Sequence, residues 1–141
     1  MKKQFLSIVV IFIVIITVLG LYMYNYQKQQ LLAEKNNQFY EKYTKGKILG
    51  TDLITLINKV MDANDRNAIS KNGKYYEDDN EKTIKIYIKF LETEEDIYME
   101  DIAEKTSETF IKFFALEQFE CVKKEYHSKT GNLKSMIFQQ I

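Results

Sequence analysis

The side chains best suited to nucleophilic chemistry are isolated in this chain. Cys121 is the single cysteine and His127 the single histidine. A catalytic thiolate must lie within hydrogen-bond reach of the imidazole that activates it. The two residues are six positions apart on one predicted strand, which puts them on the same face but separates their Cα atoms by ~20 Å. We therefore expect Cys121 to be a small core side chain and His127 to be a polar group near a turn.

Acidic side chains of the kind that bind calcium form two short runs, Glu77-Asp78-Asp79 and residues 92–96. Neither run has the EF-hand spacing, and the first continues into Asn80-Glu81 without the glycine of that loop. We interpret both as solvated loops. The patterns G-x-x-x-x-G-K-[ST], G-x-S-x-G, C-x-x-C and H-E-x-x-H are also missing. The sequence thus predicts no catalytic, cofactor-binding or metal-binding residues, and we expect the protein not to be an enzyme.

Aromatic residues provide the remaining candidate site. The chain holds 10 tyrosines and 9 phenylalanines, and tyrosine is enriched in protein interfaces. The alternative is that most phenylalanines are core and that the tyrosines follow a general compositional bias. We select Tyr75, Tyr76 and Tyr87 as a possible partner interface, and Tyr87 most clearly faces away from the inferred core.

Length and charge narrow the classes of protein to consider. The 141 residues suffice for one small domain beyond an apolar N-terminal run. Basic and acidic side chains number 20 each, and Lys2 and Lys3 precede that run, so the rest of the chain is slightly acidic. Without a cationic excess or a basic stripe, nucleic acid is not an expected partner. One cysteine cannot form an intramolecular disulfide, so stability must come from packing.

Residues 5–24, FLSIVVIFIVIITVLGLYMY, carry no charge. A helix of ~20 residues spans ~30 Å, which matches the hydrocarbon core of a bilayer. The run is rich in β-branched residues, but in lipid the backbone must satisfy its hydrogen bonds internally, which requires a helix. Lys2 and Lys3 precede the run, and lysines favour the cytoplasmic side. The sequence therefore predicts a single-pass protein of the cell membrane, with a cytoplasmic N-terminus and an extracytoplasmic C-terminal domain.

A cleaved signal peptide is the alternative interpretation of this run. Its apolar region would be ~7 to 15 residues long and would end in small residues at a cleavage site. Here the run is longer and continues into LYMYNYQKQQ, whose tyrosines Tyr22, Tyr24 and Tyr26 suit the outer membrane interface. We expect the anchor to be retained.

Helical patterns come next along the chain. Residues 25–48 are rich in helix formers and are expected to extend the anchor as a stalk. Thr51 or Asp52 is expected to cap the following helix. Its apolar stripe recurs at helical spacing: Leu53, Leu56, Ile57, Val60 and Met61. A further helix, capped by Thr93, is expected over residues 94–114. The apolar stripe of that helix is Met99, Ile102, Thr106, Phe110 and Phe113.

Alternating and turn-rich segments predict strands. Asn72-Gly73 predicts a small hairpin of residues 68–71 and 74–77. A strand with one buried face is expected from the alternation of Ile84, Ile86, Ile88 and Phe90 with polar residues. The C-terminal region predicts a hairpin around SKTGN, in which Gly131 and Asn132 supply the positive-φ positions.

These elements predict an α+β fold: an N-terminal transmembrane helix extended into a stalk, then a small domain of two amphipathic helices on an antiparallel sheet of three to five strands. The expected organisation is a cytoplasmic tip at 1–4, the transmembrane helix at 5–24, the helical stalk at 25–48 and the extracytoplasmic domain at 49–141.

This layout resembles that of type IV pilins and type II secretion pseudopilins, and the resemblance implies a structural or assembly role in which anchor helices pack together. The family pattern has a glycine or alanine just before F-T-L-x-E, whereas KKQFLSIVV has neither that glycine nor the glutamate. The segment YTKGKILGTDLITLINKVMD is also similar to one in single-span proteins of low-GC Gram-positive bacteria, some of them pilus-related. It carries no catalytic residue.

Two hypotheses about function follow. The first is a membrane-anchored structural or assembly component of the cell envelope, which contacts other envelope proteins or itself. The second is an anchored extracytoplasmic module that binds or senses a peptide or small ligand. A deep apolar pocket with convergent polar groups would favour the second.

Overall fold

The structure, a computed structural model, describes residues 2–92, 95–104 and 107–141. The chain divides into two compact units, Met1–Leu32 and Ala33–Ile141. Helix α1 (Lys2–Thr44) contributes residues to both units. We call the second unit the head.

The described residues of the first unit belong to α1, and its side chains over residues 5–24 are apolar on nearly every side of the helix. Among the described residues, α1 is the one helix that is long and apolar enough to cross a membrane. This follows from its length and composition, and a signal sequence has the same properties. Its polar Thr17 bonds within the helix, because the hydroxyl donates to the Ile13 carbonyl at 2.8 Å. This internal bonding is what a helix in lipid requires.

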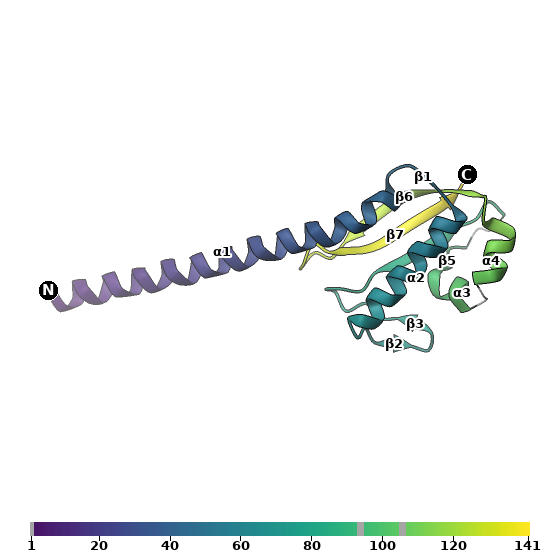
Figure 1. Ribbon diagram of the computed structural model, residues 1–141. Coiled ribbons are helices and arrows are strands. Elements are labelled where there is room, and N and C mark those ends of the chain that lie inside the picture. The colour runs from purple at the N-terminus through teal and green to yellow at the C-terminus, as the bar shows by residue number, and fades with distance from the viewer. Residues whose placement is uncertain (1, 93–94, 105–106) are drawn as a thin grey trace. The chain divides into compact units, whose positions relative to one another are not determined.

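The head contains a five-stranded sheet in the order β1-β6-β7-β4-β5 (Figure 1). The strands are β1 (Lys47–Leu49), β4 (Lys85–Lys89), β5 (Ile97–Tyr98), β6 (Gln118–Tyr126) and β7 (Leu133–Gln140). The predicted α+β class, a long N-terminal helix followed by a small helix-and-sheet domain, is confirmed. One detail is corrected: β4 and β7 run parallel, so the sheet is mixed. Strand β7 lies between β6 and β4. The hairpin makes β7 antiparallel to β6, and β7 runs in the same direction as β4.

One face of the sheet carries the core. Helix α2 (Gly50–Arg66) lies across that face with residues 33–44 of α1, which bury Tyr40 and Tyr43. The predicted strand alternation is confirmed in β4, where Ile86 and Ile88 are fully buried. Their neighbours on β7, Met136 and Phe138, are also fully buried. The predicted stripe of α2 is likewise confirmed, with Met61 packing at the margin of the core.

The start of α2 differs from the prediction. No side chain among the described residues caps it, so neither Thr51 nor Asp52 has the expected role. Instead, two amides of the first turn donate to carbonyls of the segment before β6: Gly50 to Glu117 at 2.9 Å and Thr51 to Ala115 at 3.3 Å. A Cβ on Gly50 would lie 1.9 Å from the Phe114 carbonyl oxygen, so only glycine fits this approach.

The single helix predicted over residues 94–114 is wrong. The described part of this region forms β5 and then two short helices, α3 (Met99–Glu104) and α4 (Ser107–Phe114). Ile97 and Tyr98 are extended because they pair with β4, a tertiary contact that periodicity cannot reveal. Met99, Ile102 and Phe110 are buried as predicted, whereas Phe113 is exposed. Thr93, Glu94 and Thr106 lie outside the described residues.

Both predicted hairpins form, with local differences. The first consists of β2 (Lys71–Asn72) and β3 (Tyr75–Tyr76), joined by Gly73 and Lys74, so its turn lies one residue later than predicted. The second is β6–β7, where Gly131 has the expected positive φ of 75°. Asn132 does not: its side chain instead donates to the Glu81 carbonyl at 3.1 Å.

Candidate functional site

The face of the sheet opposite the core is the first candidate site, and we call it the outer face. Strand side chains alternate between faces, so the residues between the buried ones on each strand point to this side. Register defines a line across three strands: Tyr98 on β5 opposes Tyr87 on β4, which opposes Ile137 on β7. This line runs from the edge strand β5 to the central strand β7.

Three tyrosines form a continuous group on this face, which we call the tyrosine row. The ring of Tyr98 lies between the other two, with its centroid 5.3 Å from that of Tyr87 and 5.4 Å from that of Tyr75. Both contacts are edge-to-face, the arrangement that aromatic rings prefer. Tyr75 and Tyr98 are 39% and 43% exposed, so the row offers rigid aromatic surface to solvent.

Two phenols of the row, those of Tyr75 and Tyr87, have raised pKa values and stay neutral in ordinary conditions. The hydroxyl of Tyr75 donates to Asp101 at 3.0 Å, and this bond is the main cause that raises its pKa. Burial is the main cause that raises the pKa of Tyr87, with further contributions from Tyr98 and Glu100. A neutral phenol can both donate and accept a hydrogen bond, which suits a contact with another protein.

Charged pairs flank the tyrosine row. Lys123 and Glu125 on β6 pair at 2.7 Å, and Lys89 and Asp96 pair at 3.6 Å. All four side chains are substantially exposed. An aromatic centre with a charged, solvated margin is the usual anatomy of a protein interface.

The structure distributes the three predicted interface tyrosines unequally. It brings Tyr75 and Tyr87 together through Tyr98, which the sequence analysis did not select. Tyr76 is corrected: it is 1% exposed, and its hydroxyl bonds Asp65 at 2.8 Å at the end of α2. Because neighbours on a strand point to opposite faces, Tyr75 and Tyr76 never had a common surface. Tyr98 was missed because it lies within residues 94–114, which were expected to form a helix, and outside the apolar stripe of that helix.

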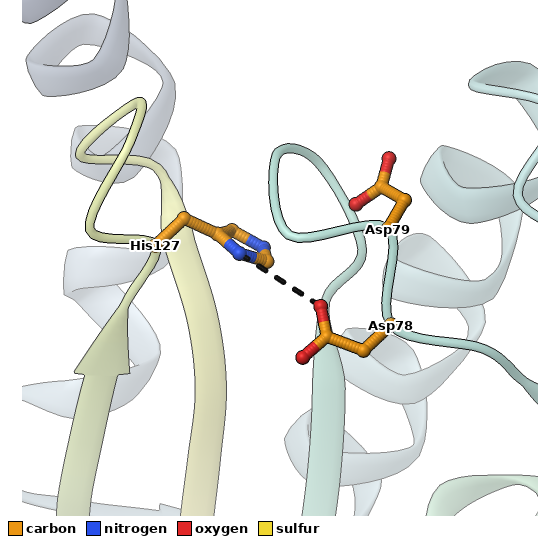
Figure 2. Close-up of side chains that lie close together, drawn as sticks. All are labelled: Asp78, Asp79 and His127. Atoms are coloured by element: carbon orange, nitrogen blue, oxygen red, sulfur yellow. Dashed lines mark ion pairs between the residues drawn. The ribbon is translucent and has the colours of Figure 1, made fainter.

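A second cluster joins Asp78, Asp79 and His127 (Figure 2), whose ligand atoms lie within 4.8 Å of one another. His127 follows β6 directly, and the two aspartates lie on the loop before β4. Figure 2 shows the imidazole pointing from its turn toward Asp78 on the facing loop. The sequence analysis separated these residues into a solvated loop and a turn, and 48 intervening positions left no local signal that they meet.

Hydrogen bonds define the chemistry of this cluster. His127 Nε2 lies 2.7 Å from the Thr83 carbonyl oxygen, which can only accept, so Nε2 carries a proton. The other nitrogen, Nδ1, lies 4.0 Å from Asp78 Oδ1. Asp78 Oδ2 is bound by Lys134 at 2.6 Å. The hydrogen bond from that ammonium is the main cause that lowers the pKa of Asp78.

Asp79 is occupied in a different way. Its Oδ1 accepts the amides of Glu81, Lys82 and Thr83 at 2.7 to 3.0 Å and the Thr83 hydroxyl at 2.9 Å. Burial opposes its ionisation, but these donors outweigh burial and hold its pKa well below the usual range. The cluster therefore fastens the 78–83 loop to the β6–β7 turn. Three potential ligand groups meet here, but lysine and amide donors already occupy the two carboxylates.

Comparison with known proteins adds no assignment. No protein-family model matches the chain, and neither the search of curated proteins nor that of solved structures returned a match.

Proposed function

We propose that the protein is a membrane-anchored structural or assembly component of the cell envelope that acts through protein–protein contacts on the outer face of its head. The observation that carries this proposal is the tyrosine row, in which Tyr75 and Tyr98 are exposed and Tyr87 is half-buried, on the face of the sheet opposite the core. A sheet face without a packing role is available for a partner, and aromatic residues there provide contact area at low entropic cost.

The apolar segment of α1 supports the membrane part of the proposal. Under this proposal, residues 5–24 remain in the bilayer and the head is extracytoplasmic. The N-terminus is cytoplasmic, because Lys2 and Lys3 precede the apolar run. The apolar run is longer than that of a typical signal peptide, which favours retention of the segment over its removal. The partner is another envelope protein or a second copy of the chain. The loose likeness to pilins in layout is compatible with such a role.

Photo-cross-linking tests the contact surface in cells. A benzophenone amino acid replaces Tyr98 in one strain and Tyr126 in another. Tyr126 is a matched control because it is 50% exposed but opposes buried Leu133 rather than a residue of the row. We expect discrete protein adducts from position 98 and few from position 126. Equal adducts from both positions, or none from either, would refute an interface on the outer face.

A second experiment tests whether the anchors themselves assemble. Single cysteines are placed along residues 8–20 in a Cys121→Ser background, and disulfide cross-linking is measured in native membranes. A helix interface would give cross-links with a period near ~3.6 residues. Detection of the intact chain by mass spectrometry in the same sample checks that the segment is retained. A shortened chain would reject the anchored model.

The alternative function is an anchored module that binds a peptide or small ligand. One observation supports it, a groove in the head. It has a volume of about 600 Å³ and is lined by apolar side chains that include Phe90, Phe110 and Phe113, together with Asp101 and Glu117. Ligand sites commonly combine an apolar lining with a few polar groups. Fluorescence polarisation with short apolar peptides tests this reading. Binding that Phe113→Ser abolishes would favour it, since Phe113 is exposed and its loss should leave the fold intact.

A further inference from the structure

A basic groove runs between α1 and α2 on the side of the head that carries the core. It encloses about 920 Å³ and is bounded by residues 35–40 of α1 and 59–67 of α2. We call it the helix groove. Four of its lining residues are cationic, Lys35, Lys59, Arg66 and Lys82, against one carboxylate, Asp62.

The spacing of the helices brings these cations together. Lys59 and Arg66 are seven positions apart on α2, which is two turns of helix, so they lie on the same side. Lys59 Nζ lies 5.0 Å from the ring centroid of Phe39 on α1, which holds it at the groove. Arg66 is close enough to the buried Tyr40 to lower its pKa, although burial has the larger effect and raises it. Lys82 closes the groove from the loop before β4.

These four cations lack carboxylate partners among the residues that the structure describes. Elsewhere in the head, lysines are neutralised in pairs such as Lys71 with Asp65, Lys123 with Glu125 and Lys134 with Asp78. Within the described parts of the chain, no corresponding ion pair within 4.0 Å involves Lys35, Lys59, Arg66 or Lys82. The groove therefore gathers uncompensated positive charge in a chain whose formal net charge is zero.

Concentrated charge of one sign raises the local concentration of the opposite ion, and a concave site strengthens the effect. Phosphate matches these donors better than a single carboxylate does. It presents several acceptor oxygens, the guanidinium fork of Arg66 can bind two of them, and lysine ammonium groups can bind the others. A nucleic-acid strand would need a longer basic stripe than one groove provides.

We propose that the helix groove binds the phosphate group of an anionic ligand, with Lys59, Arg66 and Lys82 as its principal contacts. This site is separate from the tyrosine row, and the proposal does not depend on the outer face being an interface. Two sources share the chemistry: the headgroup of an anionic phospholipid and a soluble phosphate compound. The test distinguishes them.

Lysine footprinting on the full chain measures occupancy at each position. The protein is held in nanodiscs of a zwitterionic lipid and is briefly acylated with and without tripolyphosphate. Labelling is then quantified by mass spectrometry at Lys35, Lys59 and Lys82. Exposed Lys47 and Lys112 outside the groove are internal controls. A parallel sample uses discs that contain phosphatidylglycerol and no added phosphate.

Slower labelling of the groove lysines, by about threefold or more relative to the controls, supports the proposal in either sample. Protection by tripolyphosphate identifies a soluble ligand, and protection only in anionic discs identifies a lipid headgroup. Citrate at the same concentration is the comparison anion. Uniform labelling of groove and control lysines in both samples, or equal protection by citrate, overturns the assignment to phosphate.

Variants provide an independent measurement with whichever probe protects. Lys59→Gln/Lys82→Gln removes two charge-assisted contacts and is expected to weaken the apparent affinity by about tenfold or more. Lys47→Gln/Lys112→Gln changes the net charge equally and is expected to leave affinity within about twofold. Lys59→Arg/Lys82→Arg retains the charge and should restore most of the binding. An unchanged affinity in the first variant, with its circular dichroism intact, would refute these contacts.

Discussion

The two faces of the head's sheet are built from the same strands but do different work. On the core face, Ile86, Ile88 and Phe138 are fully buried under helices. On the outer face, their immediate neighbours Tyr87 and Ile137 lie in a partly exposed line that ends at Tyr98. Because the side chains of a strand alternate between the two faces of the sheet, a substitution on one face can leave the side chains of the other face unchanged. The difference teaches that stability and contact surface can vary independently in this fold.

The largest expected effect comes from the core face. Phe138→Ala removes a fully buried ring from the strand that pairs with both β4 and β6. We expect the free energy of unfolding to fall by about 3 to 5 kcal/mol, because both transfer energy and packing are lost. Urea unfolding of the full chain in detergent, followed by the β-sheet circular dichroism signal, measures it. A loss below ~1 kcal/mol would erase the distinction between the faces.

The next largest effect on the free energy of unfolding is expected from a buried pair of hydrogen bonds that joins α2 to the residue before β4. The side chain of Asn64 on α2 is fully buried and pairs with the backbone of Ile84, donating to its carbonyl at 2.7 Å and accepting its amide at 3.0 Å. Asn64→Ala leaves both backbone groups without these bonds, and we expect a loss of about 2 to 3 kcal/mol. The same unfolding measurement applies. Asn58→Ala, at an exposed position of α2, is the matched control.

The loop beside the sheet predicts a pH dependence. The pKa of Asp79 is lowered in the folded head, so its ionised form contributes stability above the unfolded pKa of about 3.9. That contribution is lost as pH falls through the folded pKa. At neutral pH we expect the free energy of unfolding of the wild type to be about 1 to 2 kcal/mol higher than that of Asp79→Asn. The difference should shrink below pH ~4, where the unfolded aspartate gains its proton first.

Urea titrations of both proteins at several pH values provide this measurement. Glu34→Gln on the exposed surface of α1 controls for the loss of one negative charge. A difference between wild type and Asp79→Asn that stays constant down to pH ~2 would contradict the role given to the ionised carboxylate.

The smallest expected effect on stability comes from the outer face. Tyr98→Ala removes the central ring of the tyrosine row, and we expect a loss of at most about 1 kcal/mol, since an aromatic pair at a surface contributes little. Partner cross-linking from a probe at Tyr87 should nevertheless fall several-fold. A variant that unfolds the head would place the row in the core, whereas one that changes neither readout would remove it from the interface.

Residue patterns were informative where local physics decides structure. An uncharged run at 5–24 predicts a helix that can span a bilayer, and such a helix forms within α1. Alternation in β4 and the helical stripe of α2 predicted the buried faces correctly. Each of these features depends on neighbours in sequence, because one period of a strand or helix already determines which side is apolar.

The failures share a different cause. Residues 97–98 are extended because β4 offers them a pairing edge, and α2 begins without a side-chain cap because carbonyls before β6 accept its first amides. Tyr76 is buried because the end of α2 binds its hydroxyl. In each case a partner distant in sequence replaces the local signal on which prediction relied.

By itself, the sequence determined the apolar helix, the α+β class and the faces of its clearest elements, because these follow from composition and period. The tertiary structure alone decided which side chains meet. It placed Tyr98 between Tyr75 and Tyr87, His127 beside Asp78, and Lys59 with Lys82 at one groove. The reason is physical: strand order and helix packing bring together residues tens of positions apart, and no local pattern encodes that order.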